Sequence, residues 1–386
     1  MWGKRIKTSR ERIAKQLEDL WNYTQEVASE ELKDSTPTGF DQMNPEDVRR
    51  TIEQIDEALK DKPVEKAIKQ KVNYAKKNWA NNLERYEKDE QVLGERGSYS
   101  KTDTDATFMR MKEDHMKNGQ LKPAYNTQIS TNNQIITNYT IHQNPGDTKT
   151  LKPHMESFKN EYGFMPSEIT ADAGYGSEEN YEYLEQNNVD AYVKYPYFDK
   201  ERCEKEKAKP VFHVDNLYYN QDQNCYYCPI GQRMDYLGST KMATDNGFER
   251  MISKYQAQNC FGCPMRGMCH RSKGNRIIEV SHRLNELKAK ARARLLSEQG
   301  VTHRKKRPIE VEAVFGMLKQ NMGFRRFLLK GLDKVSIEFG LLAMAHNLKK
   351  LAKMADFSSF FNFLCTFPDP SSQWKIIFIQ KPVLAG

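Results

Sequence analysis

Two acidic residues lie in settings where a carboxylate can hold a metal ion. Asp172 follows a strand-like run, residues 168–171, and two glycines lie within the next four positions. In an α/β fold, the ligand site is usually built at the carboxyl ends of strands, and the glycines allow the backbone to turn away from the acid. The alternative interpretation is a turn aspartate that precedes a helix capped by Ser177.

Glu312, the second of these acids, lies in a segment predicted to be helical. At ~100° per residue, Glu312 falls at the edge of an apolar face, and Lys319 and Arg326 follow it at seven-residue spacing as one stripe. Such an acid can hold a metal while the cations hold phosphate. Glu310 lies at the opposite edge of the face and has no basic residues in line with it, so we prefer Glu312. The alternative interpretation is an ordinary surface stripe of salt bridges.

Carboxylates from separate elements can share hard divalent cations such as Mg²⁺. A two-metal site activates an attacking oxygen and stabilises a leaving oxygen in phosphodiester chemistry. Such sites usually need a third carboxylate, and the candidates within this chain are Asp103, Asp105 and Asp147.

Five of the seven cysteines are clustered at spacings typical of metal ligands. The pattern is Cys225-x2-Cys228, followed by Cys260-x2-Cys263-x5-Cys269. Paired thiolates two residues apart can bind one tetrahedral Zn²⁺, and the lack of an export signal favours metal over disulfides. An iron–sulfur cluster and unmetallated thiols are the alternatives, and a tetrahedral site leaves one cysteine spare.

The positive charge is concentrated in one segment. The 386 residues include 60 Lys+Arg and 52 Asp+Glu, a net charge of +8. Residues 281–350 hold 16 basic and 6 acidic residues, a net +10, so the rest of the chain carries −2. A concentrated basic patch suits phosphate binding; a solvated helix face is the alternative. The candidate DNA-binding residues are Arg304, Lys305, Lys306, Arg307, Lys319, Arg325 and Arg326.

Other features set limits on the class of protein. No run of ~18 apolar residues occurs, which argues against a membrane span, and no glycine-rich loop for a nucleotide cofactor occurs. Without a secretory signal, we expect a cytoplasmic protein, associated with the nucleoid if it binds DNA.

Changes in composition divide the chain into five parts. The first is charged and helical, with helix starts at Ser9 and Asn44 and with Trp21 and Trp79 as core residues. In the next part, strands and helices follow one another in an α/β pattern. It begins with a hairpin whose two strands are separated at Asn132-Asn133. The predicted parts are a coiled-coil-like arm (1–95), an α/β segment (96–199), a Cys-rich insertion (200–280), a helical segment with Glu312 (281–352) and a tail without an assigned role (353–386).

Three long segments resemble a bacterial insertion-sequence DDE transposase, and the resemblance extends from about residue 2 to residue 352. The segments are SYSKTDTDATFMRMKEDHMKNGQLKPAYN, ADAGYGSEENYEYL and RPIEVEAVFGMLKQNMGFRRFLLKGLDKVSIEFGLLAMAHNLKKL. The resemblance implies an RNase H-like α/β fold, a mixed sheet with flanking helices, in which 96–199 and 281–352 form the catalytic domain. It also implies a strand transferase dependent on Mg²⁺ or Mn²⁺ that cuts and joins double-stranded DNA, often as a homodimer.

Carried over residue by residue, the resemblance assigns Asp172 to the family's second acid and Glu312 to the third, with Lys319 at the spacing that the family keeps. The resembled subgroup has a cysteine-bearing insertion between these acids. Its C-P-x-G and C-x2-C-x5-C patterns imply that the zinc ligands are Cys228, Cys260, Cys263 and Cys269. Cys225 would then be the spare cysteine.

One departure from the family concerns the first acid. The family carries it in a D-G-T-type strand upstream of the helical arm, and no such motif occurs in this chain. We therefore expect an N-terminally truncated, inactive protein without the central strand of the sheet, whose unpaired backbone groups cost ~1–3 kcal/mol each. Asp105 is the candidate substitute for the first acid. The open hypotheses are an active transposase, a non-catalytic DNA-binding remnant and a zinc-stabilised interaction protein.

Overall fold

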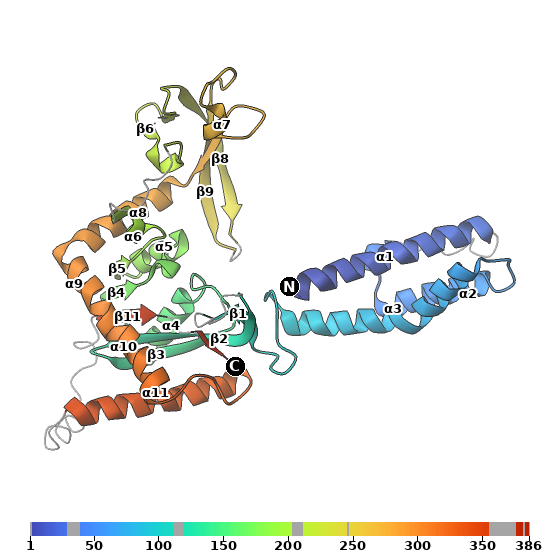
Figure 1. Cartoon of the computed structure of the whole chain (residues 1–386), viewed down its shortest axis with the longest axis horizontal. Helices are drawn as coiled ribbons and strands as arrows, with labels where there is room; N and C mark the ends of the chain where they lie inside the picture. The colour runs from blue at the N-terminus through green and yellow to red at the C-terminus, as the bar shows by residue number, and fades with distance from the viewer. Residues whose placement is uncertain are drawn as a thin grey trace. The chain divides into compact units, whose positions relative to one another are not determined.

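The computed structural model describes residues 2–28, 39–111, 119–202, 211–244, 247–354, 376–380 and 383–385 (Figure 1). Helices and sheets are both present, so the protein is mixed α/β. The chain divides into two compact units, one made mainly of residues 1–124 with 330–332, the other of residues 125–329 with 333–385. Within the described ranges, every helix falls short of the length or the apolar character that crossing a bilayer demands.

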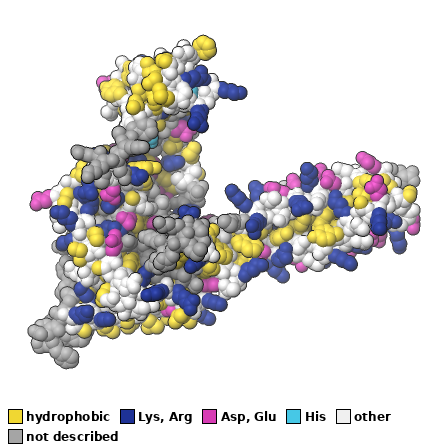
Figure 2. Space-filling view, viewed as in Figure 1, with side chains coloured by type: hydrophobic (Ala, Val, Ile, Leu, Met, Phe, Trp, Pro, Cys, Tyr) yellow, Lys and Arg dark blue, Asp and Glu magenta, His cyan; other side chains and the backbone are white. Residues whose placement is uncertain are grey.

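Helices α1 (Trp2–Val27), α2 (Pro45–Ala58) and α3 (Lys66–Leu93), with the short turn η1 (Phe40–Gln42), build most of the first unit. Their apolar residues recur at three- and four-residue spacing and pack into one cluster. Trp21 and Trp79 are buried in it, which confirms that they are core residues. Charged side chains cover much of the outer surface of these helices (Figure 2).

The two helix starts predicted for this unit have different outcomes. The start at Asn44 is confirmed, because its Oδ1 accepts the N–H of Asp47 at 2.8 Å and Pro45 takes the first helical position. The start at Ser9 is wrong, because α1 begins at Trp2. Ile6 is buried on the same face as Ile13, so the apolar face extends past Ser9 toward the N-terminus.

The second unit is organised around a mixed sheet. β2 (Leu121–Asn132) and β3 (Ile135–His142) form the predicted hairpin, whose turn residues Asn133 and Gln134 have the positive φ of a tight turn. β1 (Thr107–Arg110) pairs with Leu121–Ala124, the first residues of β2, and all of these residues belong to the first unit. β4 (Glu168–Ala171) and β5 (Asp190–Val193) are parallel neighbours. β11 (Ile376–Gln380) lies between β2 and β4, antiparallel to β2 and parallel to β4.

The tail, which had no predicted role, supplies β11 and also β12 (Val383–Ala385), which pairs with β2. The sequence predicted that the central place in the sheet would be empty, and β11 fills it. Ile379 lies opposite Ser130 of β2 and Ala171 of β4. The facing backbone groups of these strands therefore have partners, and the expected cost of unpaired groups does not arise there. Residues 355–375 of the tail lie outside the described residues.

Helices flank this sheet. α4 (Leu151–Tyr162), α5 (Glu178–Gln186) and α8 (His282–Leu296) share the main apolar cluster with β4 and β5, beside the short α6 (Phe198–Arg202). A continuous helical stretch then runs through α9 (Glu298–Arg307), the π-helical η4 (Pro308–Glu312), α10 (Ala313–Gly316) and the π-helical η5 (Met317–Asn321). α11 (Leu332–Met354) packs on β3, where the Phe339 and Tyr139 rings lie 5.4 Å apart.

The Cys-rich insertion forms an antiparallel five-stranded sheet of its own, in the order β10-β9-β8-β7-β6. Its strands are β6 (Tyr218–Asn220), β7 (Cys225–Tyr227), β8 (Arg233–Ala243), β9 (Glu249–Ala257) and β10 (Ile277–Val280), accompanied by η3 (Val214–Asn216) and α7 (Arg266–Cys269). Tyr226, Met234 and Tyr255 form its small core. The sequence did not predict these strands, because β8 is mostly exposed and lacks a clear apolar alternation.

Polar side chains form a buried network between β2, β3 and α4. Ser130 Oγ lies 2.6 Å from His154 Nε2, while Thr140 Oγ1 lies 2.8 Å from His154 Nδ1 and 2.7 Å from His142 Nε2. Burial, with a smaller effect of His142, lowers the pKa of His154 to about 3, and burial lowers the pKa of His142 to about 4. Both rings therefore stay neutral in the folded protein at a pH where an exposed histidine is protonated.

Acid is expected to destabilise the protein through these two histidines. The unfolded chain binds protons as the pH falls through about 6.5, whereas the folded protein resists protonation, so stability present above that pH is lost toward pH 4. Each histidine contributes about 1.4 kcal/mol per pH unit in this window. In urea unfolding across it, His154→Gln should show a shallower loss than wild type, and the exposed His213→Gln should not. Equal slopes in all three proteins would contradict this account.

Candidate active site

Asp172 lies directly after β4, at the carboxyl end of the strand, as the sequence predicted. Its carbonyl oxygen accepts the N–H of Tyr175 at 3.1 Å, which forms the short turn η2 (Ala173–Tyr175). Gly176 packs against the end of β5, where a Cβ would lie 2.3 Å from the carbonyl oxygen of Lys194. This close approach of two backbones requires a glycine, and it fixes the loop that presents Asp172.

Glu312 ends the π-helical turn η4. In this wider turn the N–H of Ala313 bonds the carbonyl of Pro308, five residues earlier, so residues five apart lie over one another. Glu312 is thereby brought over Arg307. Glu310 is buried instead, and its Oε2 accepts the backbone N–H of Gln134 in the β2–β3 turn at 2.8 Å. The two glutamates therefore have different surroundings, and Glu312 is the more exposed of them.

Arg307 joins the two candidate acids. Its Nη2 lies 2.5 Å from Asp172 Oδ2, and its Nη1 lies 3.1 Å from Glu312 Oε1. The arginine side chain is 7% exposed, whereas those of Asp172 and Glu312 are 40% and 50% exposed. The structure thus brings Asp172 and Glu312, which are distant in the sequence, to one buried guanidinium while their carboxylates remain accessible from solvent.

This placement corrects the expected role of Arg307, which the sequence grouped with the neighbouring basic residues as a DNA contact. Its charge is buried and engaged by two acids. Arg304 is partly buried, donates to the carbonyl of Leu295 at 3.1 Å and lies over the Phe198 ring, and burial lowers its pKa. Lys305 and Lys306 are the exposed cations of this run.

The sequence predicted that Glu312, Lys319 and Arg326 lie in one stripe of a single helix. This prediction is wrong for Arg326. The helical stretch ends at Asn321, and Gly323 follows with φ +70°. A glycine in this left-handed conformation is a common helix stop. Lys319 is therefore partly buried within the helix, whereas Arg325 and Arg326 are exposed in the segment beyond it.

Asp147 is a further carboxylate close to the Asp172 loop. A Cβ on Gly174 would lie 2.9 Å from Asp147 Oδ2. Burial raises the pKa of Tyr175 well above its ordinary value, the charges of Asp147 and Asp172 raise it further, and Arg307 opposes them. Among the described residues, however, no three His, Cys, Asp or Glu side chains are arranged to hold a metal ion. Asp147 therefore accompanies the acid pair without completing a ligand set.

Asp103 and Asp105 belong to the first unit. Within it, Asp103 Oδ1 accepts the N–H of Gly331 at 3.2 Å, and Asp105 Oδ2 accepts the N–H of Leu332 at 2.9 Å. Carboxylates at a helix N-terminus are favourable because they accept its unpaired N–H groups. Asp105 thus accepts a backbone N–H at the start of α11. Its role as a substitute first acid stays a prediction.

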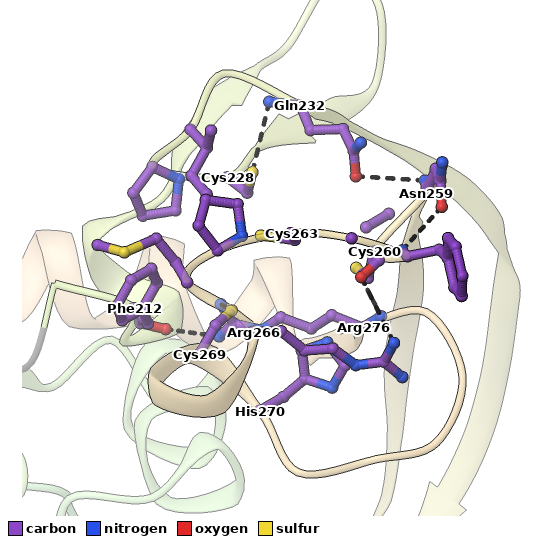
Figure 3. A pocket seen from close by; sticks show the side chains of 17 residues that line it. Phe212, Cys228, Gln232, Asn259, Cys260, Cys263, Arg266, Cys269, His270 and Arg276 are labelled. Carbon is purple, nitrogen blue, oxygen red and sulfur yellow. Dashed lines mark hydrogen bonds between the residues drawn. The ribbon is translucent and has the colours of Figure 1, made fainter.

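Four cysteines line one pocket of the insertion (Figure 3): Cys228, Cys260, Cys263 and Cys269. The backbone N–H of Gln232 lies 3.4 Å from Cys228 Sγ, and that of Arg276 lies 3.4 Å from Cys260 Sγ. Arg276 Nη1 also lies 3.0 Å from Cys269 Sγ.

Cys225 lies outside the lining of this pocket. It is buried in β7, and its Sγ lies 3.8 Å from Gln223 Oε1. It and the four pocket cysteines are free thiols. The four cysteines that the resemblance favours thus line one pocket, and Cys225 lies outside it. Among the described residues, however, they are not arranged as a group that could hold a metal ion.

Comparison with known proteins adds one finding. Residues 227–352 match the family model described as a transposase DDE domain. The matched segment begins in β7, includes the four pocket cysteines, Arg307 and Glu312, and ends within α11, and Asp172 precedes it. No curated protein and no solved structure matches the chain. The match supports a DDE transposase, a class of proteins that acts on DNA.

Sequence reasoning missed the position of Arg307, whereas Asp147 was already one of the three candidates for a third carboxylate. Arg307 precedes Glu312 by five residues, and an ordinary α-helix of 3.6 residues per turn would place them on different faces. Only the π-helical turn aligns them. The Pro308 that follows Arg307 marks an irregular helix, but it does not specify a π turn.

Proposed function

We propose that this protein is a DDE-type transposase of a bacterial insertion sequence, which cleaves phosphodiester bonds and transfers DNA strands with a divalent metal. The observation that carries the proposal is the convergence of Asp172 and Glu312 on the guanidinium of Arg307. Two carboxylates that bind one cationic group have the charge and the hard oxygen donors that Mg²⁺ or Mn²⁺ takes. Such a metal, when bound, activates an attacking oxygen and stabilises a leaving one.

Arg307 has two consequences in this proposal. It keeps the two acids together, since its hydrogen bonds neutralise their mutual repulsion. It also competes with a metal for the same oxygens, because both bonds are charge-assisted. Asp172 and Glu312 would be the metal ligands, and Arg307 would have to withdraw from at least one of them.

The exposed cations around the helical stretch suit double-stranded DNA. Lys305 and Lys306 are exposed in α9, and Arg325 and Arg326 are exposed after η5. Each cation that neutralises a phosphate releases counterions, so binding should weaken steeply with salt. Lys319 is partly buried, and Arg304 lies over the Phe198 ring. These two residues are therefore less suited to phosphate contact than the exposed cations. By resemblance, the protein would act at the nucleoid and as a homodimer.

The proposal includes impaired catalysis. The resemblance to an RNase H-like sheet implies a first acid on the central strand, and β11 occupies that place. β11 has no acidic residue, and Gln380 and Asp172 each directly follow the Ile379–Ala171 pair in their own chain segments. A neutral amide is a weaker ligand for a hard cation than a carboxylate. Asp147, beside the Asp172 loop, is a better candidate for a substitute acid than Asp105.

For the insertion, residues 200–280, we propose a structural Zn²⁺ held by Cys228, Cys260, Cys263 and Cys269. Support comes from their shared pocket and from the donors directed at three of the sulfurs. For the other parts we propose the boundaries expected from the sequence: an arm (1–95), a catalytic domain in two segments (96–199 and 281–352) and a tail (353–386) that adds strands to the sheet.

A second candidate is a non-catalytic DNA-binding remnant. Arg307 holds the two acids, and β11, in the central place of the sheet, has no acidic residue. Both features weaken metal binding without affecting the exposed cations. This candidate differs from the first only in catalysis.

The deciding experiment is a cleavage assay with the purified chain, Mg²⁺ or Mn²⁺, and DNA that contains the sequences flanking its gene. Cleavage that is lost in Asp172→Asn and Glu312→Gln, but kept in the exposed Glu279→Gln, supports the transposase. Loss in Asp147→Asn but not in Asp105→Asn identifies the substitute acid. Salt-sensitive DNA binding without cleavage favours the remnant, and the absence of both activities would overturn both candidates.

A further inference from the structure

Three buried side chains connect the loop of Asp172 to that of Asp147. Asn126 and Gln128 lie on one face of β2 and are fully buried, and Tyr175 of η2 is 1% exposed. The hydroxyl of Tyr175 donates to Gln128 Oε1, and Gln128 Nε2 donates to Asn126 Oδ1 at 2.7 Å. Asn126 Nδ2 in turn donates to Asp147 Oδ1 at 3.3 Å. These bonds form one continuous chain of side chains from one acidic loop to the other.

The direction of this hydrogen-bond chain follows from the groups around Asn126. Its Nδ2 lies 2.9 Å from the carbonyl oxygen of Asn144 and 3.4 Å from that of Gly146, besides the carboxylate at the end of the chain. Because all three groups are acceptors, only the NH2 end of the amide fits there, and its oxygen must face Gln128. Gln128 then presents its NH2 to that oxygen and its own oxygen to the phenol hydroxyl. Each amide orientation therefore determines the next.

Separate hydrogen bonds join the backbones of the two loops. Thr148 Oγ1 donates to the carbonyl oxygen of Gly174 at 3.2 Å. Asn180 Nδ2 donates to the carbonyl oxygen of Tyr175 at 2.8 Å and to that of Thr148 at 3.0 Å. These bonds do not involve the Tyr175 hydroxyl, so the loops should stay folded when the chain is broken. The chain itself reaches the Asp147 side chain, and its loss should act mainly on that carboxylate.

The two oxygens of Asp147 have different neighbours. Oδ1 accepts the amide of Asn126, at the end of the chain. Oδ2 lies on the side of the Asp172 loop, where a Cβ added to the exposed Gly174 would be 2.9 Å from it. A hydrogen bond to one oxygen of a carboxylate fixes the direction of the other, which is how partners of a metal ligand orient it.

We propose that Tyr175, Gln128 and Asn126 are positioning residues, which hold the Asp147 carboxylate beside the Asp172 loop as a ligand for the divalent metal. This inference rests on the proposed function, in which Asp147 is the substitute acid. The three residues do not touch the metal and act only through Asp147. Their removal should therefore lower metal affinity, and it should do so only while residue 147 is a carboxylate.

Titration of the full-length protein with Mn²⁺, followed by electron paramagnetic resonance of the free ion, tests the chain. Gln128→Met breaks it on both sides and should weaken binding roughly tenfold, the lower end of the ~10–100-fold typical for partners of a metal ligand. Tyr175→Phe breaks one bond and should weaken binding less. Tyr183→Phe removes a hydroxyl that donates to Glu156 at 2.6 Å, outside the chain, and should leave the affinity unchanged.

Two further measurements separate positioning from a purely structural role, which would lower the thermal midpoint without changing the affinity of the folded protein. In an Asp147→Asn background, Gln128→Met should have little further effect, because residues that act through one another are not additive. Gly174→Ala should displace the Asp147 carboxylate from an exposed position and weaken Mn²⁺ binding severalfold. Gly274→Ala, where a Cβ meets open space, is the matched control.

The outcomes distinguish this inference from the proposed function. Equal Mn²⁺ binding by wild type and Asp172→Asn would mean that the acid pair holds no metal, and both would fail. Binding that depends on Asp172 but is unchanged in Gln128→Met and Tyr175→Phe would overturn the positioning role alone. Additive effects of Gln128→Met and Asp147→Asn would overturn action through Asp147. If Gln128→Met does not fold, as judged by circular dichroism, Tyr175→Phe takes its place in both comparisons.

Discussion

Replacing Arg307 with methionine should increase the affinity of the acid pair for Mn²⁺ by roughly tenfold. In the wild-type protein a metal must displace hydrogen bonds of 2.5 and 3.1 Å from the carboxylates of Asp172 and Glu312. Charge-assisted bonds are worth ~1.5–3 kcal/mol, and tenfold in affinity corresponds to about 1.4 kcal/mol. The lower end applies, because both acids are partly exposed and water screens the pairs.

Titration with Mn²⁺, followed by electron paramagnetic resonance of the free ion, measures this change. Lys306→Met removes the same charge from an exposed position one residue earlier, and it should change the affinity much less. Combining Arg307→Met with Asp172→Asn should abolish the gain, which locates the bound ion at the acid pair. Unchanged or weaker binding in Arg307→Met would mean that the two acids do not form a cation site.

Exchanging Gln380 for aspartate should give the protein a metal-dependent DNA-nicking activity well above its background. Residue 380 and Asp172 each directly follow the Ile379–Ala171 pair, the last residue pair in the register of two parallel strands. A carboxylate there would add a ligand to the pair of Asp172 and Glu312. Metal ions contribute several kcal/mol of charge stabilisation in the transition state, which corresponds to roughly 10²–10³-fold in rate.

Relaxation of supercoiled plasmid DNA in Mn²⁺ measures this gain. Gln380→Asn, which changes the side chain without adding charge, is the matched control and should remain at background. The double variant Gln380→Asp with Asp172→Asn should lose the gain. If Gln380→Asp folds normally, as judged by circular dichroism, and still does not nick DNA, β11 does not complete the acidic site.

Features that depend on a few neighbouring residues could be predicted from the sequence. The cap at Asn44 and the core positions of Trp21 and Trp79 follow from side-chain chemistry and periodicity over one or two helical turns. The placement of Asp172 after a strand follows from a short β-forming run and a glycine turn. The clustered cysteines were evident from their spacing, and four of them line one pocket, but the choice of these four over Cys225 came from the resemblance.

Features that depend on distant pairing could not be predicted. β11 joins strands that lie some two hundred residues earlier, and a short apolar run in a tail does not indicate which strands it will pair with. The burial of Arg307 depends on a π-helical turn and on a loop from another part of the chain. Two basic residues adjacent in sequence, Lys306 and Arg307, therefore have opposite environments.

The sequence by itself determined the acidic, basic and cysteine-bearing segments and the kind of chemistry that each can take part in. Only the tertiary structure decided which of these groups meet: Asp172 and Glu312 at Arg307, and β11 with β2 and β4 in the centre of the sheet. The physical reason is that residue type and local spacing act over one or two turns of chain. Contacts between residues distant in the sequence depend on packing and on strand register, and both of these are determined by the folded unit as a whole.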